Sequence, residues 1–428
     1  MMHIFSMKGK TKKMRIELIA DPDILYVPLL QHIGKPAEPV VKRGERIKKF
    51  QLIGKATIGL SANIHAPVSG TVLELKDHPN ADGVMIPTIV IENDFENNEL
   101  ERPTVDYKTL TDDEINDIIE WSGIVGEGGA QFPTAFKYRV QNHKINTFII
   151  NGTECEPYLS ADYALMSERT ARIFEGINIV NRVLKADNVI ISIEEQNKDL
   201  LPIFQRYTDR EEYSHIKIKI LPNQYPQGGE LQLIKSISGI EIPREKRPFE
   251  YGFIVSNVGT ISAVYQAINS HIPLISRIIT ISGEASDNQG NFEVKIGTPI
   301  SHILRSKNLT TDDKSIILGG PMMGKAVSDF SVPITKGSSG VLFFKKIEIN
   351  RSNCIKCGYC VDVCPMHLMP LKFEENYRRN KFFALEKYNI SSCIECAACE
   401  YICPSNVPLI ESIKDGKLKL KQLANAIE

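Results

Sequence analysis

The chain has 428 residues, of which 42% are hydrophobic and 24% charged, and its formal net charge is −1 at pH 7. This length predicts two to four domains, and the near-neutral charge argues against a global attraction to nucleic acid or to anionic membranes. No apolar run approaches the roughly 20 residues that span a bilayer, and the basic N-terminus lacks the apolar core of a secretory signal. We therefore expect a cytoplasmic protein without a transmembrane segment of its own.

Residues 1–95 are expected to form a small β domain. Brief apolar pieces at residues 40–47 and 51–54 are separated by glycine turns, and further pieces follow at residues 65–72 and 88–92. The pattern resembles the barrel sandwich of biotinyl and lipoyl carrier domains. Such carriers need a lysine in a hairpin turn, and residues 64–72 contain none, so we predict a docking domain without a prosthetic group.

The polar, acidic residues 93–110 are predicted to be a linker, and strands then alternate with helices over residues 110–265. Thr111 and Glu114 have the spacing of a capping box. Compact apolar strands are predicted at residues 145–151, 189–193 and 216–221, and helices at residues 167–184 and 229–238. This alternation predicts an α/β domain with a largely parallel sheet. Residues 266–342, with short strands and many glycines, are predicted to form a small β-rich domain.

The cysteines carry the strongest functional signal, because eight of the nine lie in two runs. Each run has the spacing Cys-x2-Cys-x2-Cys-x3-Cys-Pro, which is typical of two-cluster bacterial ferredoxins and in which the fourth cysteine ligates the other [4Fe–4S] cluster. Zinc and disulfides are the alternatives, and two complete runs favour clusters over both. Residues 343–412 are therefore predicted to form a ferredoxin-like domain, followed by a basic tail at residues 413–428. The expected ligands are Cys354, Cys357, Cys360 and Cys403 for cluster 1, and Cys393, Cys396, Cys399 and Cys364 for cluster 2.

A glycine-rich loop occupies residues 123–133. It does not match a dinucleotide fingerprint, because Gln131 stands at the third glycine position and a helix rather than a strand precedes the loop. Two interpretations remain open from the residues alone, a tight turn or a phosphate-binding loop assisted by Lys137. Polar, glycine-containing segments at residues 151–157, 225–230 and 257–260 follow predicted strands, where α/β folds place ligand-binding residues. Cys155, in the first of these, is expected to be a packed structural thiol.

Together these segments resemble the FMN- and NADH-binding flavoprotein subunit of respiratory complex I and, more closely, the C subunits of Rnf electron-transport complexes. The wider similarity includes residues 28–34, 65–72 and 319–324 and both cysteine runs, and it spans essentially residues 24–415. The resemblance implies a multidomain α/β protein. Its expected parts are an N-terminal barrel sandwich, an FMN- and NADH-binding α/β domain, a small β-grasp-like (SLBB) domain and a ferredoxin-like domain.

The resemblance also implies a non-covalent FMN beneath the glycine loop, with NAD(H) as the substrate that stacks on it. Four residues would serve the phosphate side, namely Gly126, Gly128, Gly129 and Lys137. Glu156 would lie near the nicotinamide nucleotide. The residues that would line the flavin are Asn151, Glu154, Tyr225, Gly228, Glu230, Asn257 and Thr260. No further catalytic side chain is expected.

Three features depart from the family pattern. Gln131 replaces a glycine of the loop, Glu127 stands where complex I has an arginine, and residues 5–9 replace the Gly-Gly-x-His-Pro segment typical of Rnf C subunits. A carboxylate at position 127 would repel a phosphate.

The function expected from the resemblance is electron input to a membrane-associated, ion-coupled NAD:ferredoxin oxidoreductase. The chain would lie on the cytoplasmic face of the membrane, held by partner subunits, and would exchange electrons with a ferredoxin-like carrier. Two alternatives stay open. One is a soluble carrier that serves a dedicated reductase of the proline or cobalamin type. The other is an iron–sulfur adaptor that has lost its flavin.

Overall fold

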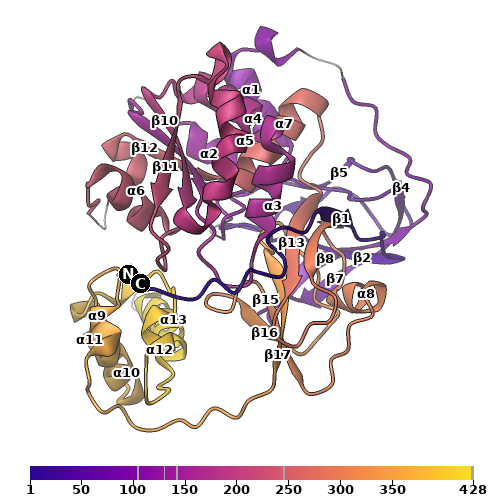
Figure 1. The fold of residues 1–428 in the computed structure, drawn as a ribbon. Helices are drawn as coiled ribbons and strands as arrows, with labels where there is room; N and C mark the ends of the chain where they lie inside the picture. Colours follow the sequence, from indigo (N-terminus) through magenta and orange to yellow (C-terminus); the bar gives the residue numbers. More distant parts are fainter. Residues whose placement is uncertain (104–105, 130, 141–142, 244–245, 426–428) are drawn as a thin grey trace.

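The computed structural model describes residues 1–428 apart from residues 104–105, 130, 141–142, 244–245 and 426–428 (Figure 1). An α/β part, two β-rich parts and a small helical module are visible, and the helical module lies at the C-terminal end of the sequence. Within the described residues, no helix combines the length and the apolar character needed to cross a membrane.

The N-terminal β domain consists of two small sheets around one apolar core. Their strand orders are β2-β8-β7-β4 and β3-β5-β6. Leu25, Ile53 and Val72 are fully buried between the sheets. The strands are β2 (Ile24–Pro28), β3 (Glu38–Pro39), β4 (Arg46–Ile47), β5 (Leu52–Lys55), β6 (Ile64–His65), β7 (Gly70–Pro79) and β8 (Met85–Asn93).

The α/β domain has a four-stranded parallel sheet in the order β11-β10-β9-β12, as the alternating pattern predicts. Strands β9, β10 and β11 follow one another across the sheet in chain order, and β12 then pairs with the opposite edge of β9. Parallel sheets bind ligands at the point where the strand order reverses, at the carboxyl ends of the strands. The strands are β9 (Thr147–Gly152), β10 (Asn188–Glu194), β11 (Ile216–Leu221) and β12 (Phe253–Asn257). The ends of β9 and β12 are therefore the expected ligand position.

Helices cover this sheet (Figure 1). The capping box at Thr111 and Glu114 is present and starts the first of them. The helices are α1 (Asp112–Trp121), α2 (Thr134–Tyr138), α3 (Ala161–Glu168), α4 (Thr170–Leu184), α5 (Leu201–Thr208), α6 (Glu230–Ser238) and α7 (Val258–Ser270). Short 3-10 helices are η1 (Tyr107–Thr109), η2 (Glu195–Leu200), η3 (Glu211–Tyr213), η4 (Pro248–Tyr251) and η5 (Ile390–Ser392).

The helix predicted over residues 167–184 is present from Thr170 to Leu184 as α4, but its predicted start is wrong, because residues 167–168 belong to α3. Arg169 lies between α3 and α4 with φ −120° and ψ 32°, outside the helical region. Its guanidinium pairs with Glu293 of the neighbouring sheet. The periodic apolar pattern predicts α4. It does not show the break at Arg169, where the side chain forms an ion pair with a distant strand.

The small β-rich part is a six-stranded sheet in the order β1-β14-β13-β17-β15-β16. Its strands are β1 (Ile16–Leu18), β13 (Ser276–Ser282), β14 (Gly290–Lys295), β15 (Lys314–Leu318), β16 (Lys325–Val327) and β17 (Gly340–Lys345), with helix α8 (Ile300–Ser306). Strand β1 pairs in parallel with β14. The first 18 residues therefore run outside the barrel sandwich, although the sequence predicts one domain over residues 1–95.

The C-terminal module contains α9 (Tyr359–Asp362), α10 (Pro370–Arg378), α11 (Phe382–Lys387), α12 (Ala398–Tyr401) and α13 (Leu409–Asn425). The sequence predicts a separate basic tail over residues 413–428, but α13 already begins at Leu409 and continues through that boundary. Ile413 is fully buried in the core of the module with Phe373 and Leu385. The helix is thus part of the ferredoxin-like module, and its Lys417 donates to the carbonyl oxygen of Cys393 at 2.7 Å.

Candidate redox site at the domain junction

The two cysteine runs fold into two loops with the same backbone. Lys356 and Gly358 in the first loop have positive φ, at 57° and 89°, and Glu395 and Ala397 at the matching positions have 56° and 60°. A one-turn helix follows each loop, α9 in the first and α12 in the second. Because left-handed residues turn the chain sharply, each loop curls so that its first three cysteines face a cavity of their own. The repeated spacing thus produces a repeated shape.

Each cavity is lined by four cysteines. Cys403 Sγ of one cavity accepts from Val407 N–H at 3.5 Å, and Cys393 Sγ of the other accepts from Glu395 N–H at 3.4 Å. Such N–H bonds suit thiolate ligands of iron–sulfur clusters, so the donor set fits two [4Fe–4S] groups. One cavity contains Cys354, Cys357, Cys360 and Cys403, and the other contains Cys364, Cys393, Cys396 and Cys399. These are the two sets expected from the spacing.

The two cavities differ in exposure. Cys354 and Cys357 of the first are exposed, whereas Cys396 and Cys399 of the second are buried. Burial raises the pKa of the Cys396 thiol to about 11. The first cavity therefore lies at the protein surface, and the second faces the protein interior.

The second cavity adjoins the α/β domain through Tyr225. This residue is 1% exposed and packs with Cys396 and Ala398. Its hydroxyl donates to the carbonyl oxygen of Cys396 at 2.7 Å. Tyr225 is thus a direct contact between the loop after β11 and the second cysteine run.

The same loop contacts the end of β9. Asn151 Nδ2 donates to the Gly228 carbonyl at 2.9 Å, and Gly228 N–H donates to Cys155 Sγ at 3.4 Å. A Cβ at Gly228 would lie 2.6 Å from the Thr153 carbonyl oxygen, so only glycine fits. Burial raises the pKa of Cys155 to about 12, and the thiol has a structural position, as expected.

The glycine loop lies against the end of β12. Glu127 N–H donates to Thr260 Oγ1 at 2.9 Å, and a Cβ at Gly128 would approach Asn257 Cβ to 3.2 Å. Asn257 caps α7 through its Oδ1, which accepts from Gly259 N–H at 2.7 Å. Ala130 of this loop lies outside the described residues.

The Glu127 carboxylate is buried and pairs with the Arg277 guanidinium from β13. Burial raises the pKa of Glu127, and the positive charge of Arg277 opposes that rise. The negative charge expected to repel a phosphate is therefore paired inside the protein. The amide of Gln131 packs against Gly337 of the small β domain.

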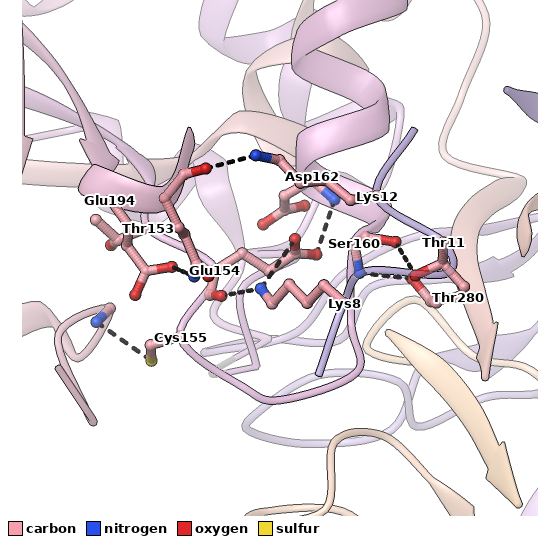
Figure 2. Close-up of polar contacts among 12 residues, drawn as sticks. Lys8, Thr11, Lys12, Thr153, Glu154, Cys155, Ser160, Asp162, Glu194 and Thr280 are labelled. Atoms are coloured by element: carbon pink, nitrogen blue, oxygen red, sulfur yellow. Dashed lines mark hydrogen bonds and ion pairs between the residues drawn. The ribbon is translucent and has the colours of Figure 1, made fainter. Parts of the chain in front are cut away.

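Glu154 and Asp162 form a buried acidic group beside the end of β9 (Figure 2). Glu154 Oε1 accepts from Asp162 N–H at 3.0 Å, and Asp162 Oδ2 accepts from Asn257 Nδ2 at 2.7 Å. Burial is the largest cause of the rise in the pKa of Glu154 to about 7, while Lys8 lowers it and Asp162 raises it. These contacts connect the ends of β9 and β12.

Other predicted residues already have protein partners. Glu156 accepts from the N–H groups of Met322 and Met323 at 3.0 and 2.9 Å, and burial raises its pKa to about 7. Lys137 Nζ is 2.7 Å from Glu230 Oε1. Glu156 thus joins the loop between β15 and β16, and Lys137 pairs with Glu230 at the site's edge.

The structure therefore brings most of the predicted flavin residues together at one edge of the sheet. The fit for FMN rests on Gly129, where a Cβ would meet no atom within 4 Å, on Gly228, where no Cβ fits, and on a topological switch point. Glycine gives a ligand close access to backbone donors, whereas the amides of Asn151 and Asn257 hydrogen-bond to Gly228, Asp162 and Gly259.

Sequence reasoning missed Lys8, Asp162, Arg277 and Lys336. Arg277 carried a signal, because it shares the inward face of a strand with Ile279 and Ile281, and a charge there requires a partner. Lys336 is 1% exposed and donates to the carbonyls of Asn63 and Gly123, both at 2.7 Å. Lys8 carried no signal in its basic segment.

Three domain families match the chain in this order. They are the RnfC barrel sandwich hybrid domain at residues 2–96, the Nuo51 FMN-binding domain at residues 119–266 and the 4Fe-4S dicluster domain at residues 353–407. The predicted barrel sandwich, FMN domain and two-cluster domain are thereby confirmed, and so are FMN and [4Fe–4S] clusters as cofactors.

Full-length relatives agree with the domain matches. The C subunit of the "Ion-translocating oxidoreductase complex" of Rhodobacter capsulatus is 40% identical over 97% of this chain and 81% of its own length. The C subunit of the "Proton-translocating ferredoxin:NAD(+) oxidoreductase complex" of Clostridium ljungdahlii is 39% identical over 85% of this chain and 80% of its own. The C subunit of the "Na(+)-translocating ferredoxin:NAD(+) oxidoreductase complex" of Acetobacterium woodii is 34% identical, over 89% and 87%.

A solved structure shares the fold at lower identity. A chain of the NAD+-reducing [NiFe]-hydrogenase in the H2-reduced state superposes with a TM-score of 0.51 and 18% identity, over 74% of this chain and 61% of that one. The chain thus spans less than two thirds of the hydrogenase chain, and this likeness concerns the fold alone. Domain order, cysteine runs and identity over nearly the whole length together show that the chain belongs to the family of Rnf complex C subunits.

Proposed function

We propose that the chain is the electron-input subunit of a membrane-associated, ion-coupled oxidoreductase that moves electrons between NADH and ferredoxin. The names of the Clostridium ljungdahlii and Acetobacterium woodii relatives support this pair of substrates. Bound FMN supplies the exchange between hydride chemistry, which moves electrons in pairs, and the single-electron chemistry of iron–sulfur clusters. The chain's own residues hold these groups close to one another.

The loop at residues 225–228 is the observation that carries the proposal. At one end, the Tyr225 hydroxyl donates to the carbonyl of Cys396, and at the other the Gly228 carbonyl accepts from Asn151. One short segment therefore contacts both the flavin edge of the sheet and the second cysteine loop. An electron-transfer protein needs such proximity, whereas two unrelated binding modules do not.

The proposed roles of the residues follow their positions. Gly126, Gly128 and Gly129 serve the phosphate side, with Lys137 at the edge, where release from Glu230 would free its ammonium. Glu156 serves the nucleotide side. The flavin edge is formed by Asn151, Glu154, Tyr225, Gly228, Glu230, Asn257 and Thr260. Cluster 1 takes Cys354, Cys357, Cys360 and Cys403, and cluster 2 takes Cys393, Cys396, Cys399 and Cys364.

The finer architecture and location belong to the same proposal. A β-grasp-like assignment of the small β domain is supported by its hairpin β13–β14, its helix α8 and the parallel pairing of β13 with β17. The barrel sandwich and this domain would dock the chain on partner subunits at the cytoplasmic face of the membrane.

The test is anaerobic purification followed by flavin, iron and sulfide assays and NADH titration in the visible spectrum. We expect one FMN, about eight irons per chain and bleaching of both chromophores by NADH. FMN and iron without a response to NADH would instead indicate a carrier for a dedicated reductase. Iron without FMN would refute the dehydrogenase function and leave an electron-relay adaptor.

A further inference from the structure

The first 14 residues lie against the α/β domain as a segment that ends in a turn at residues 9–13, here called the N-terminal strap. Met2 forms a bridge with Tyr225, and the Ser6 carbonyl accepts from Tyr158 N–H at 2.8 Å. Thr11 is fully buried, and its Oγ1 accepts from Ser160 Oγ at 2.7 Å. The strap is therefore held at several points on both sides of Lys8.

Lys8 extends from the strap into the acidic group at the end of β9 (Figure 2). Its ammonium lies 3.4 Å from Glu154 Oε2, with the two side chains 3% and 8% exposed, and it also donates to the Glu154 backbone carbonyl. A buried charge is costly unless it is paired, and removal of one partner leaves the other uncompensated. Lys8 and Glu154 therefore depend on each other in the folded protein.

Glu154 in turn is connected to the flavin edge. Its second oxygen accepts from Asp162 N–H, the Asp162 side chain accepts from Asn257 Nδ2, and Asn257 caps the helix behind the glycine loop. The acidic groups around Lys8 also include Glu156 and Glu194. Burial raises the pKa of both carboxyl groups, and the positive charge of Lys8 lowers it by a smaller amount. Arg277 is the other cation that lowers the pKa of Asp162.

We propose that Lys8 is a positioning residue of the FMN site, which neutralises Glu154 and keeps its carboxylate fixed between the strap and Asp162. This inference rests on the proposed role of the β9 edge in holding FMN. FMN is an anion, and an unpaired carboxylate at this edge repels it. The strap, in the region where the family's usual N-terminal segment is replaced, is thus part of the binding site rather than a loose terminus.

The experiment compares FMN release from full-length, anaerobically purified variants after dilution, followed by the rise in flavin fluorescence at pH 6 and pH 9. Lys8→Met removes the charge, Lys8→Arg keeps it, and Lys8→Met/Glu154→Gln removes both charges. Lys12→Met is the matched control, because Lys12 lies on the same strap but pairs with Asp199 at 3.0 Å. Iron content and thermal unfolding report on folding in every sample.

We expect Lys8→Met to release FMN about tenfold faster than the wild type at pH 9, and less so at pH 6, because a higher pH favours the ionised form of Glu154. Lys8→Arg and Lys12→Met should each stay near the wild-type rate, and the double variant should release FMN more slowly than Lys8→Met. The double variant leaves neither charge buried alone, so it is expected to fold even if Lys8→Met does not. Slower release from the double variant than from Lys8→Met supports the proposal.

Three results would overturn it. Unchanged FMN release from Lys8→Met would show that the strap is only structural and leave the proposed function intact. Equally fast release from Lys8→Met and from the double variant would show that Lys8 does not act through Glu154. Wild-type protein without FMN would overturn both this inference and the proposed function.

Discussion

The contact between Tyr225 and the second cysteine loop leads to a quantitative prediction for Tyr225→Phe. The substitution keeps the ring, which is 1% exposed, and removes only the hydroxyl that donates to the Cys396 carbonyl at 2.7 Å. A buried acceptor left without its donor costs about 1–3 kcal/mol. Because no cavity is created, this loss should appear almost entirely as looser attachment of the loop that holds cluster 2.

The assay is loss of iron from the anaerobically purified protein in the presence of a chelator, followed by the visible absorbance. A cost of about 1–3 kcal/mol corresponds to a roughly 5–150-fold larger population of the opened loop, so cluster 2 should be lost faster by about that factor. Cluster 1, in the separate cavity with Cys354 and Cys357, should be lost at the wild-type rate.

Tyr138→Phe is the matched control. The Tyr138 hydroxyl makes a hydrogen bond of 2.9 Å to Ser256 Oγ inside the α/β domain, and the tyrosine is 2% exposed. It should destabilise that domain by a similar amount without changing the loss of iron. Equal iron loss from both variants, or no change in Tyr225→Phe, would refute the reasoning that this hydroxyl holds the loop.

Three further substitutions test other parts of the structure. Gly228→Ala places a methyl 2.6 Å from the Thr153 carbonyl and should cost about 1–3 kcal/mol and reduce FMN per chain, whereas Gly9→Ala, with no atom within 4 Å, should do neither. Lys336→Met leaves two carbonyls without donors and should lower the denaturant midpoint. Burial lowers the pKa of Lys336 to about 7, so between pH 7 and pH 10 the unfolded chain holds a proton on this lysine that the folded chain has lost. The wild type should therefore gain stability relative to the variant as the pH rises over this range in denaturation curves. A difference in stability that does not change with pH would contradict this. Ala397→Gly relieves the strain of a φ of 60° and should stabilise the protein by up to about 1 kcal/mol, measured as a higher urea midpoint. A lower midpoint would show that the contacts of the methyl group outweigh the backbone strain.

The sequence by itself predicted those features whose cause is local. Two cysteine runs predicted two matching loops, because all the turning residues lie within a few positions of the sulfurs. Apolar runs predicted β9, β10 and β11, and Thr111 with Glu114 predicted the start of α1. Polar segments after these strands indicated a ligand-binding edge, because the carboxyl ends of parallel strands meet at one side of a sheet.

Only the tertiary structure decided which charges face that edge. Lys8 and Glu154 are 146 positions apart, Glu127 and Arg277 are 150 apart, and Tyr225 and Cys396 are 171 apart. Whether a buried carboxylate repels an anion or is neutralised depends on which distant cation the packing of domains brings to it. A local pattern of residues carries no information on such a partner. From the sequence, the carboxylate of Glu127 is therefore expected to repel a phosphate, whereas in the folded protein it forms a buried ion pair with Arg277.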